Sequence, residues 1–210
     1  MSAPPRRRAT RARTTRETEI RVTLDLDGSG RTEIATGVGF LDHLLTALAF
    51  HARFDLALSC RGDLQVDDHH TAEDCALALG AALDEALGER AGIARFGHAF
   101  APLDEALARS VVDLSGRPFA AIELGLRREQ LGALSAENAA HVLQSLALAA
   151  RATLHVDVLR GVNDHHRAEA AFKATALALR QAVARDGVAA APAARGRRPA
   201  ARIPSTKGRL

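Results

Sequence analysis

The chain has 210 residues, of which 47% are hydrophobic, so it can form one ordinary domain or two small fused halves. No apolar run approaches the roughly 18 residues of a membrane span, so no membrane-spanning helix is expected. The two cysteines, Cys60 and Cys75, are too few for a disulfide framework, and the arginine-rich N-terminus has no apolar segment typical of a secretory signal. We therefore expect a cytoplasmic protein without a membrane partner.

The net charge of +3 is unevenly distributed along the chain. Residues 1–16 carry six arginines, residues 187–210 carry six basic residues, and neither segment contains an acid, so the middle of the chain has a net charge of −9. Basic ends can bind nucleic acid, but these have no interleaved aromatic residues and no reading motif. We predict no nucleic-acid partner, a disordered arm at residues 1–16, and a flexible linker at residues 188–210.

The first half, residues 17–92, begins with strict alternation of apolar residues over 18–26, which predicts a half-buried strand. A hairpin-type turn at 27–30 leads to a second predicted strand at 31–36. A helix is expected to about residue 50, and a strand with alternating apolar residues follows from Phe54 to Cys60. The half ends with a long predicted helix from about residue 69 to residue 87.

The second half, residues 93–187, repeats this order. Strands are predicted at 106–114 and 118–124, with a Ser-Gly turn between them. A helix capped by Ser135 runs to about residue 150, a strand follows at 153–160, and the last helix ends near residue 185. Each half is thus predicted to be a β-β-α-β-α unit, and the duplication gives an α+β fold with helices packed on one face of each sheet.

One hexapeptide occurs twice. Residues 68–73 read DHHTAE and residues 164–169 read DHHRAE, ninety-six positions later. On a helix, adjacent side chains diverge by about 100°, so neighbouring histidines suit two different ions, whereas either histidine can share an ion with the glutamate of its hexapeptide. Imidazole with carboxylate suits manganese, iron or zinc. A histidine pair that flanks a helix without binding a ligand is the alternative, but two copies favour a metal site.

Two more histidines occupy matching places in the repeat. His43 and His141 each lie on the helix that precedes a hexapeptide, 26 residues before His69 and 24 before His165. Alone, each would be expected to be a core histidine. Together with the hexapeptides they give six histidines and two glutamates, enough for two ions with open positions for substrate or water. The candidate metal ligands are His43, His69, His70, Glu73, His141, His165, His166 and Glu169.

Lysine is rare in the chain, with only Lys173 and Lys207 among 28 basic residues. Lys173 lies four residues after Glu169 on the same predicted helical face. Lys207 follows Ser205 and Thr206 in a short segment rich in hydroxyls and backbone amides, which suits a phosphate group. A tail end without a ligand is the alternative for that segment.

The chain resembles the imidazoleglycerol-phosphate dehydratase family. The matching segments are RTTRETEIRV (13–22), GVGFLDHLL (37–45), DDHHTAED (67–74), ARFGHAFAPLDEALARSVVDLSGRP (94–118), GVNDHHRAEAAFKA (161–174) and IPSTKG (203–208). The resemblance implies a duplicated ribosomal-protein-S5-domain-2-like fold. It also implies dehydration of D-erythro-imidazoleglycerol 3-phosphate to imidazole acetol phosphate in L-histidine biosynthesis, with the substrate imidazole bound as imidazolate by two Mn(II) ions per active site.

The resemblance assigns the site residues. One ion would take His69, His141, His165 and Glu169, and the other His43, His70, Glu73 and His166. The implied catalytic residues are Glu17, Glu73 and Glu169. The implied contacts to substrate or its phosphate are Glu17, His43, His51, His69, Arg95, Arg117, His165, Lys173, Ser205, Thr206 and Lys207. The partners implied are a small phosphate substrate and further copies of the chain, in a homo-oligomer of roughly 24 subunits with active sites at subunit interfaces.

Two other classes remain open from the residues. A di-metal hydrolase of phosphate esters would use the same ligands to generate hydroxide and would release inorganic phosphate. A metal-buffering or nucleic-acid-binding protein would use the histidines and basic ends without depending on Lys173.

Overall fold

The computed structural model describes residues 6–185, and Ser205, Thr206 and Lys207 lie outside this range. Within it, no helix is both long and apolar enough to cross a membrane. The strands are β1 (Arg8–Thr14), β2 (Thr18–Asp25), β3 (Thr32–Ala35), β4 (Asp55–Gly62), β5 (Phe96–Leu103), β6 (Ala106–Asp113), β7 (Phe119–Glu123), β8 (Gln130–Leu131), β9 (Leu134–Ser135) and β10 (Thr153–Arg160). The helices are α1 (Gly39–Ala52), α2 (His69–Leu87), α3 (Ala136–Ala149) and α4 (Asp164–Ala182).

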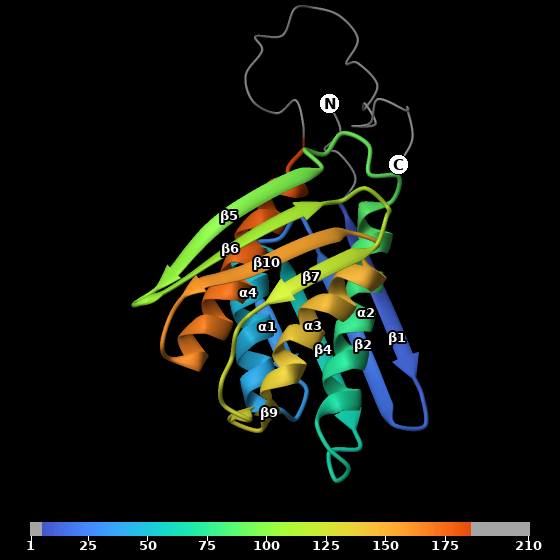
Figure 1. Cartoon of the computed structure of the whole chain (residues 1–210). Helices are drawn as coiled ribbons and strands as arrows, with labels where there is room; N and C mark the ends of the chain where they lie inside the picture. The colour runs from blue at the N-terminus through green and yellow to red at the C-terminus, as the bar shows by residue number, and fades with distance from the viewer. Residues whose placement is uncertain (1–5, 186–210) are drawn as a thin grey trace, which may run out of the picture.

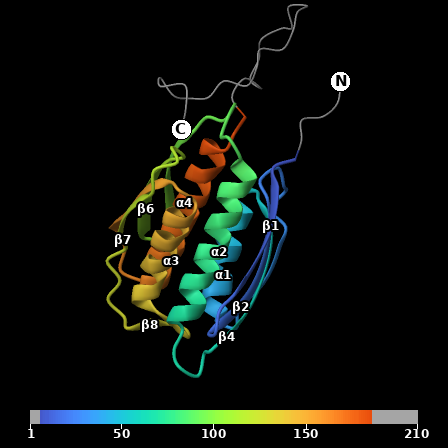
Figure 2. The same cartoon turned by 90° about the vertical axis from the view of Figure 1, so that its right-hand side faces the viewer.

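The elements form four layers (Figures 1 and 2). One four-stranded sheet, in the order β1-β2-β4-β3, is covered by α1 and α2, and a second, β5-β6-β10-β7, is covered by α3 and α4. Between the sheets, α2 packs on α3 and α1 packs on α4. Each helix therefore buries one side on a sheet and the other on a helix of the opposite half. The predicted α+β class, with duplicated units and helices on one face of each sheet, is confirmed.

The sheets differ from the prediction in which strands are neighbours. The turn at 27–30 does not join a hairpin, because β3 lies beside β4 and runs parallel to it, with Ile34 opposite Leu58. In the second sheet β7 lies in the same way beside β10. The sides of β2 and β6 are already occupied, by β1 and β4 in one sheet and by β5 and β10 in the other. The hairpin predictions were therefore wrong, although the strands themselves are present.

Each half also begins with a strand that the sequence did not predict. Arg8–Thr14 forms β1, so the second part of the predicted disordered arm is an ordered sheet edge. Phe96–Leu103 forms β5 at the equivalent edge. The two opening hairpins correspond at an offset of 88 residues, since Arg13 is opposite Ile20 in one and Ala101 is opposite Ala108 in the other.

Glycine and alanine allow the layers to approach closely. A side chain at Gly97 would collide with the backbone of α4 at Ala178, and one at Gly80 of α2 would lie 2.5 Å from the carbonyl oxygen of Leu146 in α3. The helix faces between the layers are rich in buried alanine. The helices are thus held against the sheets and against each other with little room to shift.

The outward faces of the two sheets differ in character. On the second sheet, Phe96, Phe100 and Phe119 are 59%, 56% and 54% exposed, and Val111 is 41% exposed. We call these four residues the apolar face. At the offset of 88 residues, the first sheet carries Arg8, Ala12, Arg31 and Thr23 in the same places. One half therefore presents polar and small residues to solvent, and the other presents aromatic rings.

All four helices point the same way, as Figure 2 shows for α2, α3 and α4. The starts of α2 and α3 are joined where Asp68 accepts hydrogen bonds from Ser135, and their ends meet where Arg90 donates to the carbonyl oxygen of Ala150. The starts of α1 and α4 meet where the rings of Phe40 and His165 are 5.0 Å apart. Both hexapeptides therefore lie at the same end of the helix layers.

Candidate metal centre

The first group of metal-ligand candidates lies between α2 and α3. His69, Glu73 and His141 offer ligand atoms that all lie within 4.8 Å of one another. A glutamate oxygen of Glu73 is 3.0 Å from Nε2 of His141, and the rings of His69 and His141 are stacked at 4.9 Å. His69 and Glu73 face the same way because they are four residues apart on α2, and packing of α3 against α2 supplies His141.

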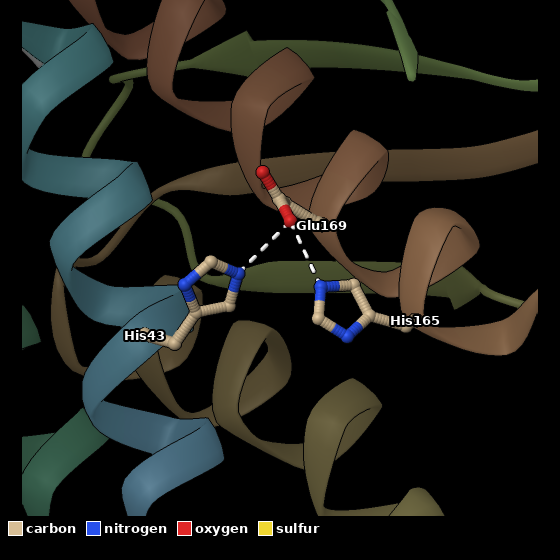
Figure 3. A group of neighbouring side chains, drawn as sticks. All are labelled: His43, His165 and Glu169. Atoms are coloured by element: carbon tan, nitrogen blue, oxygen red, sulfur yellow. Dashed lines mark hydrogen bonds and ion pairs between the residues drawn. The ribbon is translucent and has the colours of Figure 1, made fainter. Parts of the chain in front are cut away.

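The second group lies between α1 and α4 (Figure 3). His43, His165 and Glu169 also offer ligand atoms within 4.8 Å of one another. Both imidazoles point toward one oxygen of Glu169, with Nε2 of His43 at 2.9 Å and Nε2 of His165 at 3.1 Å. The i,i+4 spacing of the hexapeptide therefore brings histidine and glutamate together, as predicted.

Each group combines both halves of the chain. His43 comes from the first half and meets the second hexapeptide, whereas His141 comes from the second half and meets the first. This follows from the packing of α1 on α4 and of α2 on α3. Each group also contains members of both implied ligand sets: His69 and His141 lie with Glu73, and His165 lies with His43.

The second histidine of each hexapeptide points elsewhere. The rings of His69 and His70 are nearly perpendicular, at 74°, and those of His165 and His166 at 88°. Neither His70 nor His166 belongs to the groups formed by the described residues. The divergence expected for adjacent helical side chains is thus present.

Three side chains with a carboxylate or amide group contact the Nδ1 atoms of His69, His70 and His166. Asp63 lies 3.1 Å from Nδ1 of His70, Glu105 lies 2.7 Å from Nδ1 of His166, and Asn138 lies 3.0 Å from Nδ1 of His69. Such a contact fixes the ring and leaves Nε2 for an ion. None of these three residues was predicted from the sequence. Two of them could have been found from spacing: Glu105 lies 88 residues after Glu17, at the equivalent position of the repeat, and Asn138 lies three residues before His141. Nothing in the sequence marks Asp63.

Two carboxylates of the site, Glu169 and Glu105, have lowered pKa values and are ionised at neutral pH. Burial alone would raise the pKa of Glu169, but hydrogen bonds from Lys173, 2.6 Å away, and from His43 lower it to about 2. The hydrogen bond from His166 lowers the pKa of Glu105 to about 2 and raises that of His166 itself. Contact with Asp63 likewise raises the pKa of His70. At each of these positions a carboxylate faces an imidazole, and Glu169 also faces the ammonium group of Lys173.

His51 and Lys173 lie beside the second group. Burial first, and the charge of Lys173 second, lower the pKa of His51, while Glu169 acts in the opposite direction. His51 is therefore a neutral imidazole next to the ammonium of Lys173. A cavity of about 480 Å³ opens beside His51 at the end of α1.

Glu17 lies at the tip of the β1–β2 hairpin, against the start of α2. Its Oε1 atom is 3.7 Å from Nε2 of His70, and its side chain is 50% exposed. Since Asp63 holds Nδ1 of the same ring, Glu17 lies at the nitrogen that remains available to an ion. It therefore stands at the edge of the candidate metal centre, open to solvent.

Arg95 and Arg117 lie at the opposite end of the fold. Arg95 pairs with Asp113 at 2.6 Å and its backbone N–H donates to the carbonyl of Ala182, the last residue of α4. Arg117 is 3.7 Å from the same Asp113. Thirteen helical residues separate Ala182 from Glu169, which corresponds to about 20 Å along α4. Within one chain, the structure does not bring these arginines to the histidines.

The fold and the site together define a duplicated α+β protein with two histidine–glutamate groups, each able to hold a metal ion. The model of the family Imidazoleglycerol-phosphate dehydratase matches residues 36–179, which include both hexapeptides, His43 and His141. The chain belongs to the imidazoleglycerol-phosphate dehydratase family, a family of carbon–oxygen lyases.

Similar proteins carry the same name. The imidazoleglycerol-phosphate dehydratase of Phytophthora nicotianae is 60% identical over 190 residues, covering 90% of this chain but only 42% of that relative. The one from Candida glabrata is 55% identical over 218 residues, covering 94% of this chain and 97% of the relative. The solved structure of IGPD from Pyrococcus furiosus in complex with (S)-C348 has a TM-score of 0.78 at 36% identity, covering 95% of this chain and 100% of that one.

Proposed function

We propose that the protein dehydrates D-erythro-imidazoleglycerol 3-phosphate to imidazole acetol phosphate, a step of L-histidine biosynthesis, in the cytoplasm. Two histidine–glutamate groups assembled from the duplicated hexapeptide carry the proposal, together with membership of the family. The substrate contains an imidazole ring, which a metal centre can bind directly, and a phosphate, which basic residues can bind.

The donor atoms fit two Mn(II) ions. Imidazole nitrogens mixed with carboxylate oxygens form a borderline set that manganese accepts. The Nε2 atoms of His69, His70 and His166 are left available because Asn138, Asp63 and Glu105 occupy the Nδ1 side. When bound, the two ions would supply the positive charge that stabilises the substrate ring as an imidazolate.

The chain's own residues would bind the substrate and move its protons. Glu17 is the proposed acid and base, taking a proton from the carbon next to the one that loses the ring-side hydroxyl. Glu73 and Glu169 hold the reacting end in place. The proposed substrate contacts also include the ring-side histidines, His51, and the phosphate ligands Arg95, Arg117, Lys173, Ser205, Thr206 and Lys207, of which the last three lie outside the described residues.

The proposed active site lies between copies of the chain. Each four-ligand set takes two residues from helices α2 and α3 and two from helices α1 and α4, so an ion shared by two chains could take half its ligands from each. The position of Arg95 and Arg117, about 20 Å along α4 from Glu169, supports the same conclusion. We propose that a further copy brings these arginines to the metal centre.

The apolar face supports assembly with further copies of the chain, as the proposed homo-oligomer of roughly 24 copies requires. Phe96 and Phe100 on one edge strand and Phe119 on the opposite edge strand are each more than half exposed on one sheet face, and exposed aromatic area of this kind is typical of an interface. Arg95 lies over the ring of Phe96, with its guanidinium carbon 4.6 Å from the ring centroid. A second copy that covers this face would therefore also approach Arg95.

The decisive experiment is turnover of imidazoleglycerol phosphate by chelator-stripped protein before and after addition of Mn(II). The proposal expects metal-dependent appearance of imidazole acetol phosphate without free phosphate. Release of inorganic phosphate would instead favour a di-metal phosphoesterase, and no product from metal-loaded, assembled protein would refute the proposed substrate.

The role of Glu17 has its own test. Glu17→Gln keeps the size of the side chain and removes its ability to exchange a proton. We expect turnover to fall below detection while manganese content and assembly stay unchanged. Loss of manganese with this change would show that Glu17 holds the site together and does not transfer protons.

A further inference from the structure

The two opening hairpins place a glutamate at the same position. Glu17 and Glu105 stand immediately before β2 and β6, at the offset of 88 residues that relates the hairpins. Each approaches the second histidine of a hexapeptide: Glu17 approaches His70 and Glu105 approaches His166. Their surroundings nevertheless differ, and the difference shows how one of them is left free to react.

Glu105 is fixed by several hydrogen bonds. One carboxylate oxygen meets Nδ1 of His166 at 2.7 Å, and the other accepts from the backbone N–H groups of Val162 and Asn163. In the first half, Asp63 occupies the corresponding place at Nδ1 of His70. Glu17 is consequently not needed to orient a histidine. Among the described residues no hydrogen bond reaches its carboxylate, which lies 3.7 Å from Nε2 of His70.

A carboxylate without a hydrogen bond to any described residue needs another means of staying in place. The first half contains a polar triad around the hairpin tip, formed by the buried Thr18 and Asp74 and the exposed Arg13. Asp74 of α2 is only 5% exposed, accepts a 2.5 Å hydrogen bond from the hydroxyl of Thr18, and lies 2.7 Å from Nη2 of Arg13. Thr18 and Arg13 are on the two strands on either side of Glu17.

The second half has no such triad. At the matching positions it carries Ala101, Ala106 and Ala170, which are 3%, 1% and 0% exposed. The same fold thus tolerates three small apolar residues at these positions, so a charged triad is not required to pack helix against hairpin. A buried carboxylate is costly unless it is well paired. Of the two halves, only the one whose hairpin-tip carboxylate has no hydrogen bond to a described residue contains it.

We propose that Asp74 is a positioning residue for Glu17: through Thr18 and Arg13 it holds the hairpin tip against the helix that carries His70 and Glu73. The inference rests on the proposed function, in which Glu17 moves the proton. It adds that the equivalent glutamates of the two halves have different roles. Glu105 orients a metal ligand. In the first half Asp63 orients the ligand, and Glu17 is positioned by residues outside the metal centre.

The test compares Asp74→Asn with a matched control, Asp84→Asn. Asp84 lies on the same helix and pairs with the buried Arg90 at the end remote from the histidines. We expect Asp74→Asn to lower kcat 10- to 100-fold, because small misplacements of a reacting group have effects of this size. KM and manganese content should stay within twofold, and Asp84→Asn should leave kcat unchanged. Thr18→Val, which removes only the hydroxyl, should act in the same direction if Asp74→Asn fails to fold.

Two further readouts separate positioning from a general structural role. In a Glu17→Asp background, Asp74→Asn should lower kcat by less than threefold, because two residues acting through one group are not additive. Equal losses in both backgrounds would overturn the proposal. The second readout is hydrogen exchange of the backbone amides of Glu17 and Thr18, which donate to the hydroxyl of Thr15.

Exchange at those two amides should accelerate at least tenfold in Asp74→Asn, and unchanged exchange would refute the positioning role. This readout does not depend on turnover. If the unmodified, metal-loaded protein showed no dehydration, the proposed function would fail, and the exchange measurement alone would decide whether Asp74 fixes the hairpin tip.

Discussion

The apolar face offers the sharpest test of assembly. The change is Phe100→Ala with Phe119→Arg, which gives the second sheet the residue types found at Ala12 and Arg31 of the first. The two rings are 56% and 54% exposed. If the surface area of a phenylalanine is about 200 Å², each residue loses roughly 110 Å² of accessible area when a second copy covers it. At about 25 cal/mol per Å², burial of both rings contributes about 5 kcal/mol to the free energy of association per interface.

Only part of this free energy appears as affinity, because association also orders side chains. We nevertheless expect the dissociation constant of the interface to rise by about a thousandfold, which corresponds to about 4 kcal/mol. Sedimentation velocity of the full chain should show a large assembly for the unmodified protein and much smaller species for the double variant, with helix content unchanged by circular dichroism.

The matched control changes the polar face of the first sheet. Thr10→Ala with Thr23→Ala removes two hydroxyls that contact each other at 3.1 Å on that face. This variant should sediment like the unmodified protein. If the Phe100 and Phe119 variant also did so, the apolar face would not be an interface between copies, and the area argument would be refuted.

Three further predictions concern the metal centre. Glu105→Ala should weaken manganese binding 10- to 100-fold by freeing the ring of His166, measured by competition with a chelator; unchanged affinity would show that the contact does not orient the ligand. Glu169→Gln should destabilise the metal-free protein by up to about 3 kcal/mol at pH 7, since the pKa of Glu169 falls from 4.5 to about 2 on folding. Because a lowered pKa stabilises the fold above the unfolded value and this stabilisation is lost as pH falls, the difference in urea midpoint should shrink between pH 5 and pH 2. Arg117→Ala should raise KM at least tenfold without loss of manganese, and an unchanged KM in steady-state kinetics would exclude a phosphate contact.

Much of the fold followed from apolar periodicity, and the failures have identifiable causes. In β1 only Ala9 is a buried apolar residue, because Arg11 and Arg13 point to the helix side and pair with Glu85 and Asp74. Arginine on an inward-facing position does not look like a strand residue. In β5 the large apolar residues face outward, while the inward positions are Gly97, Ala99 and Ala101, so the pattern is inverted.

The site was predictable where it depends on one helix and unpredictable where it depends on packing. The contact between His165 and Glu169 follows from their spacing of four residues. That His43 would join this pair, and His141 the other, depends on α1 packing against α4 and α2 against α3, which local sequence does not specify. Asp63 was missed for the same reason, because a loop residue gains its role only from the helix placed beside it.

Asp27 joins the two ends of the described chain. Its carboxylate pairs with Arg7 at 2.6 Å and with Arg185 at 3.1 Å, and the peptide that links the halves lies at the same place, where Ile93 bridges to Arg185. The beginning, the junction and the end of the duplicated unit therefore meet at one point, at the end of the fold remote from both hexapeptides. The order of the two halves along the polypeptide is then arbitrary: a circular permutant opened at the junction, with Arg7 and Arg185 connected by a short linker, would keep every strand pairing and both metal-ligand groups.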